Sequence, residues 1–256
     1  GIRAVSESRG LGDVFKRQVS RNREQLTMRN VLLSIAAAAS LTTGYITGQA
    51  LANESKITKG FKSYDSMGCM LLRECKDNVD EVFSLLDISS EYTNTEEFTP
   101  HAQEFNYMLS VLHKIGVKVY LADSKYFPVN HRGIYHTVGN NFFLNREYMG
   151  EPNVLMMLMR HEGWHAAQDC MAGTIENSML AIILPEESVP MLWRTLAERT
   201  YPKESVPWEA EAQWAGRAEN MTIQALEACS RGSMWTEYEP TPLTRLWLEE
   251  NNYIHD

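Results

Sequence analysis

An apolar stretch in the second half of the chain constrains its fold most, because it carries polar side chains at helical spacing. Residues 153 to about 172 are rich in Val, Leu, Met and Ala and contain no proline, so they predict a buried helix that ends at Gly173. His161, Glu162 and His165 interrupt this run, and burying such groups without partners would be costly. The sequence therefore predicts a polar site on a buried helix; the alternative is a chance pattern on an exposed one.

The spacing of the two histidines predicts a metal site. Four residues separate His161 from His165, which places both imidazoles on one helix face, where they can reach the same ion. Imidazole is a preferred ligand of zinc, and a catalytic zinc ion keeps three protein ligands and a water. Glu162 could take a proton from that water and later give it to a leaving amine. Gly163 weakens a helix by about 1 kcal/mol relative to alanine, and one interpretation is that it opens space beside the site.

The remaining patterns predict a small sheet followed by helices. Apolar periodicity and proline or glycine boundaries predict helical character at 78–86, a helix that starts at Thr99-Pro100 and ends at Gly116, helices near 190–200 and 207–229, and a short one starting at Thr241-Pro242. Alternation predicts strands at 117–122, 133–138 and 141–145, the last two joined as a hairpin at Gly139-Asn140. The expected fold class is α+β, with a small antiparallel sheet.

The first part of the chain has the pattern of an export signal. From Met28 the sequence has a basic start, an apolar run over 31–41 and an Ala50-Leu51-Ala52 ending, which predicts a signal peptide over 28–52. Residues 1–27 are then an upstream segment outside the mature protein, and 53–256 form a single domain that is secreted or periplasmic. The alternative is a membrane anchor over 31–52, although threonine, glycine and tyrosine in its second half make it a poor span.

The charge of the predicted mature domain argues against nucleic acid as a partner. Residues 53–256 hold 17 Lys+Arg and 30 Asp+Glu, a net charge of −13. So acidic a domain repels phosphate and anionic membrane surfaces. We therefore expect no nucleic-acid binding and no stable membrane insertion after signal cleavage.

The cysteines predict disulfides. All four, which are Cys69, Cys75, Cys170 and Cys229, lie in the predicted mature domain. An even number of cysteines in an exported chain favours two disulfides over free thiols, and the sequence leaves their connectivity open.

The helix also resembles a known kind of active site. His161-Glu162-x-x-His165-Ala166-x-x-Asp169-x-x-Ala172-Gly173-x-Ile175 is similar to the active-site helix of thermolysin-like enzymes, which are zincin metallopeptidases. The order of strand, hairpin and helix over roughly 100–230 resembles the minimal zincin scaffold, whose edge strand lines the substrate cleft. The resemblance implies a zincin-like fold, a Zn²⁺ cofactor and a peptide or protein substrate.

The third ligand is expected from a later helix. A metzincin would need a glycine and a third histidine soon after the motif, and residues 167–169 supply neither. In zincins with a glutamate ligand the segment E-x-x-A-D/N provides it, and Pro207-Trp208-Glu209-Ala210-Glu211-Ala212-Gln213 resembles that segment. The resemblance implies Glu209 as the metal ligand, with Gln213 in the place of an outer-shell Asp or Asn. Glu211 is the nearest alternative, and Glu186 and Glu187 come at nearly the thermolysin spacing.

Two further residues are candidates for supporting roles. Asp169 lies four residues after His165 on the same helix face, where it could orient an imidazole; the alternative is an exposed acid near the helix end. His136, beside Tyr135, could polarise a substrate carbonyl; the alternative is a half-buried strand residue.

Together these patterns predict an exported zinc metallopeptidase of the glutamate-ligand, or gluzincin, type. Glu162 would act on a zinc-bound water, and His161, His165 and Glu209 would hold the ion. One alternative is a non-catalytic exported domain that binds zinc or a partner. Another keeps the hydrolase but gives it a different substrate, such as a cell-wall peptide amide.

Overall fold

The computed structural model describes residues 67–75 and 77–255. The predicted upstream segment 1–27, the signal peptide 28–52, the alternative anchor 31–52 and the first residues of the predicted domain lie outside this part. No helix within the described residues has the length and apolarity needed to cross a bilayer.

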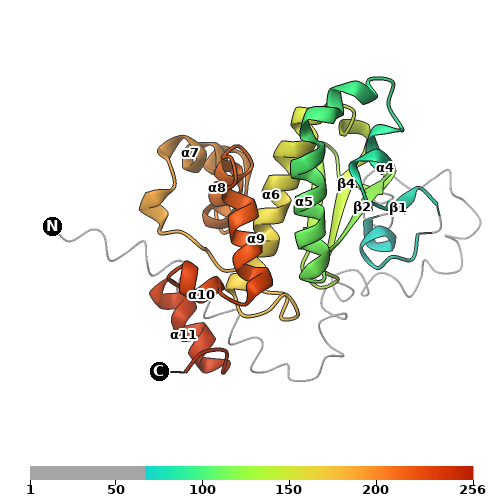
Figure 1. Ribbon diagram of the computed structural model, residues 1–256. Coiled ribbons are helices and arrows are strands. Elements are labelled where there is room, and N and C mark those ends of the chain that lie inside the picture. Colours follow the sequence, from blue (N-terminus) through green and yellow to red (C-terminus); the bar gives the residue numbers. More distant parts are fainter. Residues whose placement is uncertain (1–66, 76, 256) are drawn as a thin grey trace, which may run out of the picture. The chain divides into compact units, whose positions relative to one another are not determined.

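Within the described residues, four strands form one sheet in the order β1-β2-β4-β3 (Figure 1). They are β1 (Val79–Glu81), β2 (Lys118–Ala122), β3 (Gly133–His136) and β4 (Asn141–Asn145). The β1–β2 and β3–β4 pairs are antiparallel, but β2 and β4 are parallel, so the prediction of an antiparallel sheet is wrong for that pair. The cause is the hairpin, which places its second strand beside β2 and leaves β3 at the edge.

The predicted hairpin is confirmed, with a four-residue turn that shortens β3 by two residues. The amide of Gly139 donates to the carbonyl oxygen of His136 at 3.2 Å. Asn140 has a φ of +50°, a left-handed conformation that asparagine adopts more readily than most residues.

The helices follow most of the predicted pattern. They are α4 (Leu85–Ser89), α5 (Ala102–Lys114), α6 (Pro152–Met171), α7 (Met191–Thr200), α8 (Val206–Ala215), α9 (Met221–Arg231), α10 (Met234–Glu237) and α11 (Pro242–Glu250), with 3-10 turns η4 (Thr95–His101), η5 (Ser124–Tyr126), η6 (Arg146–Tyr148) and η7 (Glu186–Ser188). The α+β class is confirmed.

Two helix predictions are wrong in part. The helix expected over 207–229 is two helices, because the chain breaks after Gly216 and Asn220 takes a φ of +61°. The helical character expected over 78–86 is absent at Val79–Glu81, which pairs with β2 as a strand. Tertiary pairing outweighs local propensity in such a short segment.

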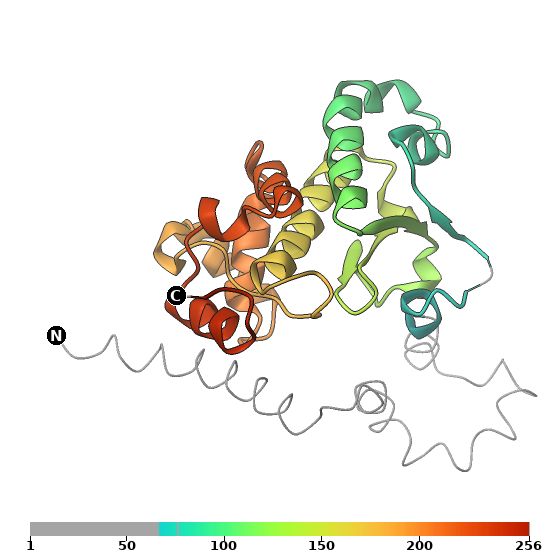
Figure 2. The same ribbon diagram turned by 60° about the horizontal axis from the view of Figure 1, so that its bottom comes forward.

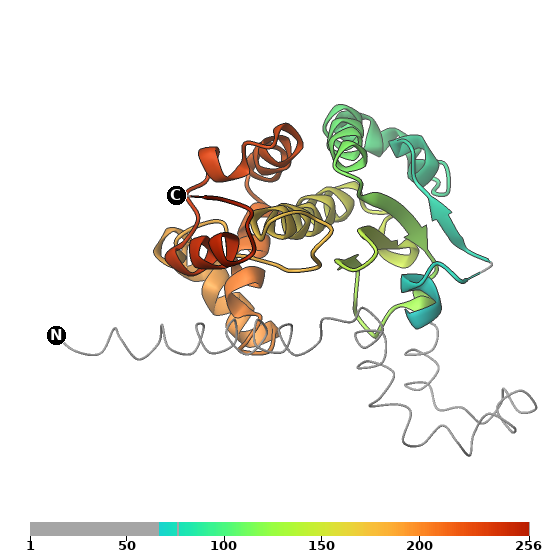
Figure 3. The same cartoon turned by 90° about the horizontal axis from the view of Figure 1, so that it is seen from below.

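Helix α6 lies at the centre of the described fold. The sheet and α5 lie on one side of it, and α7, α8 and α9 lie on the other (Figures 2 and 3). It packs against β3, α5, α8 and α9. The opposite face of the sheet is covered by an apolar cluster formed by Met70, Tyr120, Ala122, Tyr126, Phe127 and Phe143.

The C-terminal end of α6 is held by side chains from the last helices. Trp247 Nε1 donates to the carbonyl oxygen of Ala172 at 2.7 Å, and Trp235 Nε1 donates to that of Met171 at 3.1 Å. Gly173 follows with a φ of +138°, which confirms it as the residue that ends the helix. These contacts fix the position of α6 along its axis.

Two disulfides are present, as predicted. Cys69 pairs with Cys75, and Cys170 pairs with Cys229 across 59 residues of sequence. The second bond joins the last turn of α6 to α9.

Candidate metal centre

Helices α6 and α8 bring two imidazoles and one carboxylate together. The Nε2 atoms of His161 and His165 lie 3.4 and 3.7 Å from Oε2 of Glu209, and one possible ligand atom from each residue lies within 4.8 Å of the others. The two rings are nearly perpendicular, at 88°. No other group of three His, Cys, Asp or Glu side chains converges in this way within the described part of the chain. The three residues form a possible metal-binding triad.

The spacing of the donor atoms fits a tetrahedral ion. Ligand atoms about 2.1 Å from a tetrahedral zinc ion lie roughly 3.4 Å from one another, close to the two observed separations. Oε2 of Glu209 is buried and has no hydrogen-bond partner among the described residues. A buried acceptor without a partner is costly, and a bound cation would supply one.

Two glycines allow β3 and α8 to approach α6 closely. A Cβ atom at Gly133 would lie 2.8 Å from Cδ2 of Leu158, and one at Gly216 would lie 3.0 Å from the carbonyl oxygen of Met157 and 3.4 Å from Cβ of His161. The backbone itself is ordinary at Gly216, so close approach is what favours glycine there. The edge strand and the ligand-bearing helix are thus both held against residues 157–161 of α6.

Electrostatics favour a charge-separated triad. Burial raises the pKa of Glu209, but the imidazoles of His161 and His165, 3.4 and 3.7 Å away, outweigh burial and hold that pKa well below its usual range. Burial lowers the pKa of His165, but the neighbouring carboxylate of Glu209 raises it to about 9. Glu209 is therefore ionised and ready to act as a ligand.

Gln168 orients the ring of His165. Nδ1 of His165 and Oε1 of Gln168 lie 2.8 Å apart, so the amide oxygen accepts the Nδ1 proton and leaves Nε2 facing Glu209. Gln168 is itself fully buried, and its Nε2 donates to Oε2 of Glu211 at 2.8 Å. Gln168 lies three residues after His165, so helical spacing could have indicated it from the sequence, but the prediction missed it.

Glu211, the alternative ligand, is committed elsewhere. It is 1 % exposed, and its carboxylate accepts hydrogen bonds from Trp164 Nε1, Gln168 Nε2 and the backbone amides of Ile183 and Leu184. These four hydrogen bonds hold the carboxylate of Glu211 outside the triad. Glu211 supports the triad through Gln168, which contacts His165.

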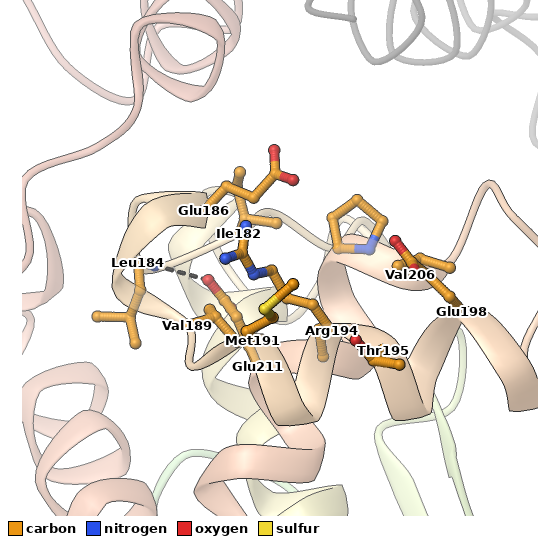
Figure 4. A pocket seen from close by; sticks show the side chains of 12 residues that line it. Ile182, Leu184, Glu186, Val189, Met191, Arg194, Thr195, Glu198, Val206 and Glu211 are labelled. Carbon is orange, nitrogen blue, oxygen red and sulfur yellow. Dashed lines mark hydrogen bonds between the residues drawn. The ribbon is translucent and has the colours of Figure 1, made fainter.

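Figure 4 shows the surroundings of Glu211. The side chain points toward the amide of Leu184 in a pocket of about 200 Å³ between α7, α8 and the segment before η7. Glu186 also lines this pocket, and neither it nor Glu187 belongs to the triad. The pocket does not include the two histidines or Glu209.

Glu162 is buried beside the triad. It is 6 % exposed, and burial raises its pKa, while the charges of His161 and His165 oppose the shift. A backbone hydrogen bond from Tyr135 also reaches this carboxylate. A carboxylate with a raised pKa accepts a proton more readily at neutral pH than an exposed one.

Tyr201 is a second residue that sequence reasoning missed. Its hydroxyl accepts a hydrogen bond from Nε2 of Gln213 at 3.2 Å. Burial, followed by the charge of Glu209, raises its pKa to about 12, so it keeps its proton. Gln213, expected to support a ligand directly, instead positions this tyrosine. The contact joins the residue after α7 to α8, so it leaves no local sequence signal.

Asp169 does not orient an imidazole, nor is it exposed. It is fully buried, and Oδ2 accepts a hydrogen bond from the hydroxyl of Tyr135 at 2.9 Å. Both predicted alternatives are therefore wrong, because β3 covers this turn of α6. The contact ties the edge strand to the helix, and burial raises the pKa of Asp169 to about 8.

This pKa predicts a change in stability with pH. A raised pKa means that the contribution of Asp169 is complete below about pH 4 and is lost as pH rises toward about 8. The side chain of Asp169→Asn cannot ionise. As pH increases through this range, the melting temperature of the variant should therefore increase relative to that of wild type, and at higher pH the difference should stay constant. Thermal melts at several pH values test this, and a constant difference would contradict it.

Of the two interpretations of His136, the half-buried strand residue is confirmed. Tyr135 points toward α6, so alternation along β3 turns His136 away from the triad, where burial lowers its pKa. Gly163 does not open space beside the site: a Cβ there would lie 3.0 Å from Cγ2 of Thr222, so this glycine lets α6 pack closely against α9.

Comparisons with models of protein families, with curated proteins and with solved structures find no match for this chain.

Proposed function

We propose that this chain is an exported zinc-dependent metallopeptidase with a zincin-like fold. The observation that carries the proposal is the convergence of His161, His165 and Glu209 around one point, with Glu162 buried beside it. When bound, the zinc ion would supply Lewis-acid activation of a carbonyl and of the attacking water.

The chain's own residues would move the proton. Glu162 takes a proton from the attacking water and returns it to the leaving amine, and its raised pKa suits both steps. The hydroxyl of Tyr201, which stays protonated, is available to donate to negative charge that develops on the carbonyl oxygen. Gln168 and Glu211 keep the ring of His165 in place.

The alternative of a non-catalytic zinc-binding domain gives Glu162 no role. A structural zinc site is closed by four protein ligands, whereas only three side chains converge here within the described residues. The open fourth position and the buried carboxylate beside it favour an enzyme.

Export is supported by the disulfides. Two disulfides in a chain of this size are typical of an oxidising compartment. The signal peptide over 28–52 remains a prediction.

The proposal is tested by metal content and by peptide cleavage. Purified wild-type protein, equilibrated with zinc and dialysed, should retain one zinc ion per chain and cleave members of a mixed peptide library. Glu209→Gln removes the ligand charge and should lose most of the zinc while it keeps the fold, which circular dichroism can monitor. A wild-type protein that binds no zinc, or that binds it and cleaves no peptide, would overturn the proposal.

A further inference from the structure

Two arginines near the candidate centre have no carboxylate partner among the described residues. Arg132 directly precedes β3, and Arg217 follows the end of α8. The guanidinium of Arg132 lies 5.4 Å from the centre of the Tyr148 ring, and that of Arg217 lies 4.8 Å from the Trp193 ring. Nη1 of Arg217 also donates to Oε1 of Gln213 at 2.9 Å. Both residues are exposed, so their remaining donors can reach a ligand.

These two arginines lie beside the same turn of α6. Gly133, next to Arg132, packs against Leu158, and Gly216, next to Arg217, packs against Met157 and His161. Partial burial lowers the pKa of Arg217; the hydroxyl of Tyr201 opposes this shift, and the charge of Arg132 lowers the pKa further. Two guanidinium groups beside one turn of α6, with no carboxylate partner among the described residues, are an unfavourable arrangement and unusual in a chain of net charge −9. A bound anion would relieve it.

Their offsets from the candidate centre agree. Arg132 lies three residues before Tyr135, whose backbone bonds to Glu162, and three strand residues span about 10 Å. Helix α8 ends at Ala215, six residues or about 9 Å after Glu209, and Arg217 follows two residues later. Since Gly133 and Gly216 both pack against residues 157–161 of α6, the two arginines lie at the same end of the site.

The free edge of β3 gives a direction to a bound peptide. The carbonyl oxygen of Arg132 accepts a hydrogen bond from the amide of Asn145 on β4, whereas the backbone of Tyr135 bonds to Glu162. The backbone N–H and C=O groups of alternate residues in β3 therefore point away from β4. A peptide that pairs antiparallel with this edge runs opposite to β3, so its C-terminal side lies toward Arg132. Antiparallel pairing is the slightly more stable arrangement.

We propose that Arg132 and Arg217 bind a carboxylate of the peptide substrate, on the C-terminal side of the scissile bond and roughly three residues from it. Guanidinium groups bind carboxylates through paired, charge-assisted hydrogen bonds, which gives geometric selectivity as well as affinity. The carboxylate is either the C-terminus of a short peptide or an Asp or Glu side chain. This inference names the substrate class of the proposed peptidase and rests on that function.

The test uses three versions of one peptide that the zinc-loaded protein cleaves. One carries Glu at the third position after the scissile bond and an amidated C-terminus, one carries Gln there and is amidated, and one ends there with Gln and a free carboxylate. Wild type should cleave one or both of the carboxylate peptides with a kcat/KM about 10- to 100-fold higher than the neutral peptide, as expected for a charged hydrogen-bonded pair. The carboxylate peptide with the higher kcat/KM shows whether the bound carboxylate is a glutamate side chain or a C-terminus.

The arginine variants assign the effect. Arg132→Gln and Arg217→Gln should each reduce the preference, and the double variant should abolish it with little change for the neutral peptide. Arg199→Gln, a matched change at an exposed arginine on α7, should keep the preference. Equal cleavage of all three peptides by wild type, or a preference that survives in the double variant, would overturn the inference and leave the peptidase proposal intact.

A binding measurement separates failure of the inference from failure of the proposed function. Fluorescence anisotropy of labelled carboxylate and neutral peptides on Glu162→Gln reports affinity without turnover. If wild type cleaves no peptide, the peptidase proposal fails, and this measurement alone decides the subsite: preferential binding of the carboxylate peptide that the double arginine change removes supports it, and equal binding contradicts it.

Discussion

Glu162→Gln should abolish peptide cleavage while leaving the metal site intact. The amide has nearly the shape of the carboxylate but cannot accept a proton from water, and positioned proton transfer contributes about 10²- to 10⁴-fold to rate. We therefore expect kcat/KM to fall by at least two orders of magnitude, with zinc content unchanged because Glu162 is not in the triad. Cleavage assays and metal analysis on the same preparation measure both quantities.

A matched change at Glu187 is the control for this variant. Glu187 is an exposed glutamate in η7, outside the triad, so Glu187→Gln should cleave like wild type. Full activity in Glu162→Gln would show that this carboxylate does not transfer the proton. Loss of zinc from Glu162→Gln would place the residue in the metal site itself.

The largest loss of stability is expected from Glu211→Ala. The change leaves the indole of Trp164, the amide of Gln168 and two backbone amides without their buried acceptor. Breaking a buried charged network of this kind lowers the free energy of unfolding by about 3–5 kcal/mol, which for a chain of this size is a fall in melting temperature of roughly 10 °C. Thermal or urea unfolding of the metal-free protein measures it.

Two further variants distinguish the supporting role of Glu211 from the ligand role of Glu209. Glu211→Gln keeps the size and one acceptor oxygen, so its loss of stability should be smaller. Glu209→Ala should weaken zinc binding strongly but cost less stability without metal than Glu211→Ala, because it removes contacts to two imidazoles at 3.4 and 3.7 Å in place of four buried hydrogen bonds. The opposite order, with Glu209→Ala the less stable protein, would contradict the roles assigned to the two glutamates.

The sequence predicts the centre well where the signal is local. His161 and His165 share one helix face by spacing alone, with Glu162 beside them, and α6 and its end at Gly173 follow from apolar periodicity and glycine preference. Glu209 was predicted from a resemblance, and it lies beside both imidazoles in the structure.

Tertiary contacts explain what the sequence left open. Glu209 and Glu211 lie on one helix two residues apart. The donors that distinguish the buried Glu211 from the candidate ligand come from distant segments: two side chains of α6 and the amides of Ile183 and Leu184. Asp169 was misjudged for a similar reason, since the sequence does not reveal that β3 covers its turn of α6 through Tyr135. The strand at Val79–Glu81 exists because β2 offers it an edge, which local propensity does not reveal.

Anomalous diffraction at the zinc absorption edge, from crystals of the protein grown with zinc, locates the ion and its ligands. The proposed triad predicts one strong peak about 2.0–2.2 Å from Nε2 of His161, from Nε2 of His165 and from a carboxylate oxygen of Glu209. A peak coordinated by Glu211 or another carboxylate in place of Glu209, or no peak between the two imidazoles, would contradict it.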